Sequence, residues 1–203
     1  MLILRSSPSS PFVRKIRIAA SVLGLDNEIA IEPADTVNPS DTVRQQNPLG
    51  KIPTLVLEDG MVLFDSRVIL DYLDHRAGGG AIVPKDPGAR FAALRLQALA
   101  DGIMDASILL VYEGRWRASE RHEPKWLEHQ AGKIARALAS LEVAMDGAPA
   151  AVPSVGDIAL ACALGYRDFR FDGTWRKGHP RLVAWLDQFA ARVPAFAATK
   201  PAG

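Results

Sequence analysis

The sequence lacks most of the features of disulfide-rich and membrane proteins. It contains a single cysteine, Cys162, among 203 residues, so no internal disulfide can form. This scarcity is typical of a reducing cytoplasmic compartment. No apolar run approaches the roughly 18 residues of a membrane-spanning helix, and residues 1–5 are too short for the apolar part of a signal peptide. We therefore expect a soluble, cytoplasmic protein that does not enter a membrane.

An excess of charge of one sign is also missing. The 24 Lys and Arg residues nearly match the 23 Asp and Glu residues, which leaves a net charge of +1 at pH 7. Such a balance gives no electrostatic reason to expect a nucleic-acid partner. The few histidines lie in separate segments and lack metal-ligand spacing: His75, His122, His129 and His179. The sequence therefore predicts neither nucleic acid nor a metal as a ligand.

What the chain does have is a hydrophobic fraction of 48% and enough length for two small domains. Residues 1–77 alternate short apolar runs with a segment of helical spacing, and Asp59-Gly60 is a hairpin signal. We expect strands near residues 2–4, 28–32, 53–57 and 61–64, and helices over 11–23 and 66–77, the latter with Val68, Ile69, Tyr72 and Leu73 inward. This order predicts a four-stranded sheet with helices on both faces, a thioredoxin-like α/β arrangement.

The rest of the chain has the pattern of an all-helical domain. Three consecutive glycines and a proline in residues 78–84 indicate a linker. Helices are expected from 86 to about 112, from 124 to about 145, from 155, and a last one from 180, with a loop over 147–153. Ser154 followed by Asp157 is typical of a capping box. We therefore predict a first domain at 1–78, a linker at 79–85 and a helical domain at 86–203.

The first chemical motif lies before the first helix, in Ser9-Ser10-Pro11. Proline favours the first helical position, because no N–H needs a partner there, so Ser10 is the expected N-cap. In an arbitrary protein such a serine is most often only a cap. A hydroxyl at the positive end of a helix would, however, also stabilise an anion and lower the pKa of a bound thiol. Ser10 is therefore a candidate thiolate ligand, with Ser9 as the alternative.

Two further motifs suit an extended, peptide-like ligand. Residues 47–55 read Asn-Pro-Leu-Gly-Lys-Ile-Pro-Thr-Leu, with Pro53 at the start of a strand. A cis bond before Pro53 would let Ile52 offer its N–H and C=O as an added strand does, although an ordinary loop entering an edge strand has the same pattern. In Phe64-Asp65-Ser66 we expect Ser66 to cap a helix. Ser66 could then bind a carboxylate and Asp65 an ammonium, unless both only cap.

In this order, the three motifs resemble those of glutathione transferases. The segment Ser-Val-Gly-Asp-Ile-Ala at 154–159 and the segment His-Pro-Arg-Leu at 179–182 with Trp185 are similar to the family's helical domain. The resemblance covers nearly the whole chain and is strongest to small bacterial members of unassigned substrate. It implies a thioredoxin-like glutathione-binding domain, an all-α second domain and a cytoplasmic homodimer acting in detoxification. It also implies conjugation of the thiolate of glutathione, a co-substrate, to a small, hydrophobic electrophile without a metal.

The resemblance also implies roles for individual residues in binding glutathione. Ser10 would donate its hydroxyl to the sulfur, and Ile52, before a cis Pro53, would pair with the cysteinyl backbone. Lys51 would reach the glycine carboxylate. The γ-glutamyl end would be held by two neighbouring residues, Asp65 and Ser66. Asp101 or Asp105 would contact the glutathione of a partner subunit.

The sequence departs from the family pattern at positions that determine the type of reaction. The sequence has Ser7 and Pro8 where some classes place a tyrosine, and it has no cysteine in its first domain, which argues against tyrosine-based and disulfide-exchange routes. Tyr112 and Trp116, with Arg115, are candidates for the second-substrate cleft, although core or interface packing explains them equally well. A non-catalytic ligand-binding or regulatory protein, or a glutathione-dependent isomerase or peroxidase, remains an alternative. Cys162, among Ala and Leu, is expected to be buried and inert.

Overall fold

The computed structural model describes residues 1–147 and 150–201. Its first half contains a mixed four-stranded sheet in the order β2-β1-β3-β4. The central strand β1 runs parallel to β2 and antiparallel to β3, and β3 is antiparallel to β4. These strands are β1 (Leu2–Ser6), β2 (Ile29–Pro33), β3 (Thr54–Val56) and β4 (Val62–Leu63). The expected thioredoxin-like arrangement is confirmed, with strands that begin or end within one or two residues of their predicted limits.

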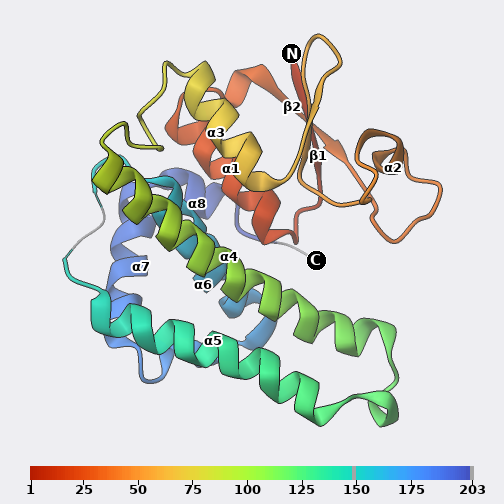
Figure 1. The fold of residues 1–203 in the computed structure, drawn as a ribbon, viewed down its shortest axis with the longest axis vertical. Coiled ribbons are helices and arrows are strands. Elements are labelled where there is room, and N and C mark those ends of the chain that lie inside the picture. The colour runs from red at the N-terminus through yellow and green to blue at the C-terminus, as the bar shows by residue number, and fades with distance from the viewer. Residues whose placement is uncertain (148–149, 202–203) are drawn as a thin grey trace.

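The helices of the first half lie on both sides of this sheet (Figure 1). Helix α1 (Pro11–Val22) joins the parallel pair and packs beside α3 (Ser66–Arg76), while the single-turn α2 (Val43–Gln46) lies across the strands from them. A 3₁₀ turn, η1 (Asp26–Glu28), leads into β2. The expectation that Val68 points inward is wrong, because it is 48% exposed. At 100° per residue, Ile69, Leu70 and Leu73 share the buried face of α3 and Val68 falls opposite it.

The second half is helical, as expected (Figure 1). Its elements are α4 (Pro87–Trp116), η2 (Ser119–Arg121), α5 (Pro124–Ala144), α6 (Val155–Phe171), η3 (Thr174–Arg176), α7 (Pro180–Arg192) and α8 (Pro194–Ala198). Helix α4 continues four residues past its expected end at Tyr112. The predicted last helix is followed by a short α8, because Pro194 ends one helix and begins the next. The predicted loop 147–153 includes residues 148 and 149, which lie outside the described residues.

Helix α6 is the centre of the molecule. Its capping box is present: the Ser154 amide donates to Asp157 Oδ2 at 2.8 Å, and the Asp157 amide donates to Ser154 Oγ at 3.3 Å. The helix is buried from Val155 to Tyr166 apart from Asp157, and it packs on both α4 and α1. One continuous hydrophobic cluster therefore runs from the sheet into the helical half.

The segment between the two halves is tied to α3 rather than loose. Both carboxylate oxygens of the buried Asp74 accept backbone N–H groups from the linker, among them those of Gly80 at 2.7 Å and Ile82 at 2.7 Å. The exact domain limits at residues 78 and 86 remain predictions. Across residues 1–147 and 150–201, no helix has both the length and the apolar character required to cross a membrane.

Candidate functional site

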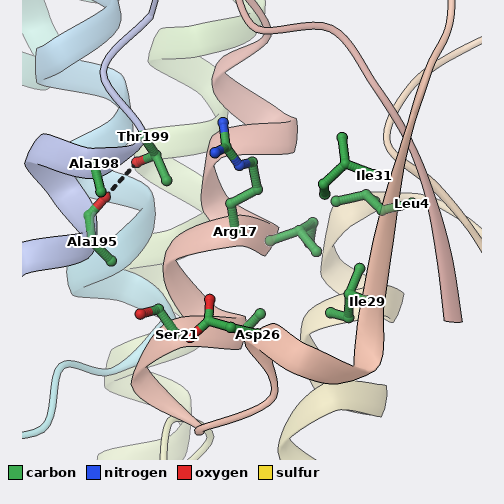
Figure 2. Close-up of a pocket in the computed structure, with 11 residues that line it drawn as sticks. Leu4, Arg17, Ser21, Asp26, Ile29, Ile31, Ala195, Ala198 and Thr199 are labelled. Carbon is green, nitrogen blue, oxygen red and sulfur yellow. Dashed lines mark hydrogen bonds between the residues drawn. The ribbon is translucent and has the colours of Figure 1, made fainter. Parts of the chain in front are cut away.

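A cleft of about 590 Å³ is lined by both halves of the chain. One wall comes from the start of α1, the segment after β2 and the segment before β3; the other comes from one face of α4 and the end of α6. A smaller hollow of about 190 Å³ lies elsewhere, between α1, β2 and α8 (Figure 2). Arg17, Ile31 and Thr199 line it, and it contains none of the residues predicted from sequence to bind or react.

Ser10 lies in the cleft at the beginning of α1. Its Oγ accepts the Val13 amide at 3.3 Å, and Pro11 occupies the first helical turn, so the expected N-cap is present. The cap uses Ser10 as an acceptor, which leaves its O–H proton available to donate. Ser9 also lines the cleft, but its Oγ lies 3.3 Å from Ser7 Oγ and shares a hydrogen bond with it. Ser10 is thus the hydroxyl better placed to serve a ligand at this helix terminus.

The segment before β3 forms the next part of the same wall. Lys51 and Ile52 line the cleft, Pro53 is buried behind them, and the Ile52-Pro53 bond is cis, as expected from the resemblance. Asn47 Nδ2 fixes this segment by donating to Lys51 O at 3.0 Å. Within the described residues, neither the N–H nor the C=O of Ile52 has a hydrogen-bond partner. This pair is therefore open to an extended ligand.

The start of α3 differs from the expectation. Asp65, not Ser66, is the N-cap: its backbone is extended and its Oδ1 accepts the Arg67 amide at 2.9 Å. Ser66 is already the first helical residue, and its side chain is turned inward, where Oγ accepts from Lys15 Nζ at 3.0 Å. Asp65 is exposed, whereas Ser66 is 3% exposed, and neither lines the cleft itself.

A buried ion pair beneath this helix start was missed from the sequence. Lys15 is fully buried, and its Nζ lies 2.6 Å from Asp101 Oδ1. Arg67 Nε donates to the other oxygen of Asp101 at 2.8 Å. Asp101 is 1% exposed with both oxygens occupied, so the suggestion that it reaches a partner's glutathione is wrong. The available signal was the spacing of Lys15 with Ile18 and Ala19, which puts a lysine on an inward face.

The helical wall brings together a mixture of aromatic, apolar and charged side chains. Tyr112 lines the cleft as expected, but Trp116 is 61% exposed and lies outside the lining. Asp105 also lines the cleft, and burial together with the neighbouring Asp101 carboxylate raises the pKa of its own carboxyl. Two further polar lining residues were not found from the sequence, Tyr166 and Arg170, and burial raises the pKa of Tyr166. They are brought here by the packing of α6 on α4, for which the sequence carries no local signal.

The single cysteine lies away from this cleft. Cys162 is fully buried in α6, as expected, and burial raises the pKa of its thiol to about 12. Searching the described part of the chain finds no group of three His, Cys, Asp or Glu side chains arranged to hold a metal ion.

A thioredoxin-like sheet domain followed by a helical domain, with a cleft that begins at the N-terminus of α1, is the architecture of glutathione transferases. The family model for the glutathione S-transferase N-terminal domain matches residues 9–76, and that for the C-terminal domain matches residues 124–188. The chain belongs to the glutathione S-transferase family.

Relatives and solved structures agree with this assignment. The uncharacterized GST-like protein YibF of Escherichia coli K12 is 37% identical, with 98% of each chain covered. The maleylacetoacetate isomerase of Pseudomonas aeruginosa is 28% identical over 93% of this chain and 90% of its own. A glutathione transferase family member from Pseudomonas fluorescens Pf-5, solved with bound glutathione, is 44% identical with full coverage of both chains and a TM-score of 0.90. The same protein was also solved with bound S-(propanoic acid)-glutathione, at a TM-score of 0.85.

Proposed function

We propose that the protein is a glutathione transferase in which Ser10 donates its hydroxyl to the sulfur of glutathione. The observation that carries the proposal is the position of Ser10: it caps the 12-residue α1, lines the cleft, and keeps its O–H proton free. The positive end of the helix and the hydroxyl would act on the same atom. A charge-assisted hydrogen bond contributes about 1.5–3 kcal/mol, which corresponds to lowering a thiol pKa by about one to two units.

The rest of glutathione would lie along the sheet-side wall. We propose that the unpaired N–H and C=O of Ile52 bind the cysteinyl backbone and that Lys51 binds the glycine carboxylate. Asp65, exposed as the N-cap of α3, would pair with the γ-glutamyl ammonium, and the N-terminus of α3 at Ser66 would receive the adjacent carboxylate. The glutathione bound by the 44% identical Pseudomonas fluorescens protein supports glutathione as the ligand.

In the proposed reaction, the thiol proton passes to solvent and the thiolate forms a bond to an electrophilic carbon of the second substrate. A leaving group, where one is present, departs with the electrons of its own bond; in an addition, the π bond of the electrophile breaks and its electrons take up a proton from solvent. Positioning and thiolate stabilisation would supply most of the rate acceleration, with no need for a redox cofactor. The S-substituted glutathione bound by the Pseudomonas fluorescens protein supports a cleft with room for a group attached to sulfur.

The test combines calorimetry and thiolate absorbance on the wild type, Ser10→Ala and, as the matched control, Ser9→Ala. We expect saturable glutathione binding with one site per chain in all three proteins. The pKa of the bound thiol should rise by about one to two units in Ser10→Ala and stay near the wild-type value in Ser9→Ala. If the bound thiol titrates identically in all three proteins, Ser10 acts only as a helix cap. If the protein does not bind glutathione at millimolar concentration, the result favours a regulatory or ligand-binding protein that does not use glutathione.

One observation favours a second candidate, a glutathione-dependent isomerase. The Pseudomonas aeruginosa maleylacetoacetate isomerase aligns with nearly the whole chain, although at a lower identity of 28%. An isomerase would return glutathione unchanged, whereas a transferase consumes it in proportion to product. Following free thiol during turnover therefore separates the two. For either activity, four further properties remain predictions: a homodimer, a cytoplasmic location, a role in detoxification and the absence of a metal.

A further inference from the structure

The helical wall of the cleft presents two guanidinium groups that lack a carboxylate partner. Arg115 from α4 and Arg170 from α6 both line the cleft. Throughout the described residues, neither forms an ion pair within 4.0 Å, in contrast to Arg117 on the same helix end, which pairs with Glu113 at 2.9 Å. The Nε atom of Arg170 is buried and has no hydrogen-bond partner. This atom lies within the protein, so the terminal guanidinium nitrogens are the donors that would face a ligand in the cleft.

These two arginines form one cluster with two tyrosines. Arg115 lies over the ring of Tyr112, with Cζ 5.2 Å from the ring centroid. Arg170 and Arg115 both act electrostatically on the Tyr166 hydroxyl and oppose the rise in its pKa that burial causes. The cluster therefore offers guanidinium N–H groups and aromatic faces together, a combination suited to a flat molecule that carries an anionic group.

The acidic residue of the same wall, Asp105, lies toward the other end of the cleft. Asp105 and Arg115 are ten residues apart on α4, which corresponds to about 15 Å along a helix axis. The cations that act on the Asp105 carboxyl are Arg67, Lys51 and Lys15, not the two arginines of the cluster. The cleft is thus divided along its length, and Arg115 and Arg170 remain an uncompensated positive region.

This positive region lies near the beginning of α1. Helix α6 packs on α1, and Gly165, which precedes Tyr166, lies against the end of the Arg14 side chain, 2.5 Å from Nη1 for an added Cβ. Arg14 is one helical turn after Ser10. Ser10 and Tyr166 also line the same cleft. A molecule seated on the cluster would therefore lie beside the atom that Ser10 contacts, rather than beside the peptide groups of glutathione.

We infer that the second substrate is an electrophile that carries a carboxylate, which Arg115 and Arg170 bind while its ring or chain packs on Tyr112 and Tyr166. The inference rests on the proposed function, because it places the reacting carbon next to a thiolate at Ser10. A suitable probe is 4-chloro-3-nitrobenzoate. Sulfur bonds to the ring carbon that carries chlorine, chloride leaves with the bonding electrons, and the carboxylate takes no part in the bond changes.

The experiment compares this acid with its uncharged analogue, 4-chloro-3-nitrobenzamide, each rate being divided by the uncatalysed rate. We expect the wild type to favour the acid in kcat/KM by about tenfold or more, as two charge-assisted hydrogen bonds allow. Arg115→Gln and Arg170→Gln should each lower kcat/KM for the acid by about tenfold while changing the amide by less than about twofold. Arg121→Gln, an exposed arginine outside the cleft, is the matched control. Arg170→Lys, which keeps the positive charge, covers the case in which removal of this half-buried side chain impairs folding.

Binding of the two reaction products provides a readout that does not depend on turnover. Calorimetry with the purified glutathione conjugates should show the carboxylated conjugate binding about tenfold more tightly than the carbamoyl conjugate, with the difference lost in Arg115→Gln. Equal affinity of the two conjugates in the wild type overturns this inference and leaves the proposed function intact. Failure of glutathione and both conjugates to bind overturns both.

Discussion

Asp41 shows how one side chain can shape a wall of the cleft. Its Oδ1 accepts the Val43 amide at 2.7 Å and Arg5 Nη2 at 2.9 Å, and its Oδ2 accepts the Asp35 amide at 2.7 Å. Asp35 lines the cleft. The backbone amides of Val43 and Asp35, followed by Arg5, lower the pKa of the Asp41 carboxyl. Its charge therefore stabilises the folded loop after β2.

The pH dependence of this contribution follows from the direction of the shift. Because the folded pKa of Asp41 lies below its unfolded value of about 3.9, the stabilisation is complete above that pH and is lost as pH falls through the folded value. We expect Asp41→Asn to lower the melting temperature by a constant amount between about pH 5 and 7, with the difference from wild type shrinking below about pH 4. Melting curves of both proteins across this range provide the measurement. A difference that grows on acidification would contradict the assignment.

At the scale of elements, the close contact between α4 and α6 depends on a glycine, which has no side chain. A Cβ built on Gly156 would lie 2.6 Å from the Ala93 carbonyl oxygen and 2.9 Å from Leu96 Cβ. The nearest obstacle is backbone, which cannot rotate away. Gly156 therefore sets how closely the first turn of α6 approaches α4, and with it the position of the helical wall.

Substitutions at two helical glycines should have opposite effects on the free energy of unfolding. Gly156→Ala should lower it by about 1–3 kcal/mol, since the added methyl group forces the two helices apart. Gly114→Ala is the matched control, because nothing lies within 4 Å of its added Cβ. It should raise the free energy of unfolding by up to about 1 kcal/mol, the difference in helix propensity. Urea unfolding measures both, and equal effects would show that the close approach is not limiting.

Elements with a local signal could be predicted from the sequence. Helix starts at Pro11, Pro87 and Pro180 follow from proline at the first turn, and that at Val155 follows from the capping box. The cap of α3 was assigned one residue too late, because Asp65 and Ser66 are both good caps and the choice depends on Lys15, which binds Ser66 from another helix. Such contacts between distant segments leave no periodic pattern.

The residues of the candidate site likewise divide into those that a local sequence motif predicts and those that it does not. Ser10, Lys51 and Ile52 line the cleft, and all three were proposed from short contiguous motifs. Arg170 and Tyr166 line the opposite wall and were not proposed, since one turn of α6 gives no indication of which side faces another domain. Sequence motifs thus predicted the sheet-side wall better than the helical wall.

At the scale of the whole molecule, a buried charge pair joins the two halves. Lys15 on α1 and Asp101 on α4 meet at 2.6 Å with exposures of 0% and 1% for their side chains. Neither charge can return to water if its partner is removed. Together with the continuous hydrophobic cluster, this pair should make the sheet and helical halves unfold as one cooperative unit.

Removing one partner of this pair should therefore lower the free energy of unfolding more than replacing both partners with apolar residues. Asp101→Leu leaves the Lys15 ammonium buried and should lower the free energy of unfolding by about 3–5 kcal/mol. The double variant Lys15→Met with Asp101→Leu should recover most of that loss, since a buried pair exchanged for apolar groups is often neutral. Arg67, whose side chain is 53% exposed, can turn to solvent in both variants. Guanidinium unfolding of the three proteins measures the effect, and a double variant no better than the single one would contradict this account.

The burial of Cys162 has a practical consequence for work on the protein. The sequence contains one cysteine, and its thiol lies inside α6 with a pKa raised to about 12. Under native conditions, colorimetric thiol reagents would therefore report glutathione consumption without a background signal from the protein. A cysteine introduced on the surface would react alone with a maleimide dye, so the wild-type chain already serves as the parent for site-specific fluorescence labelling.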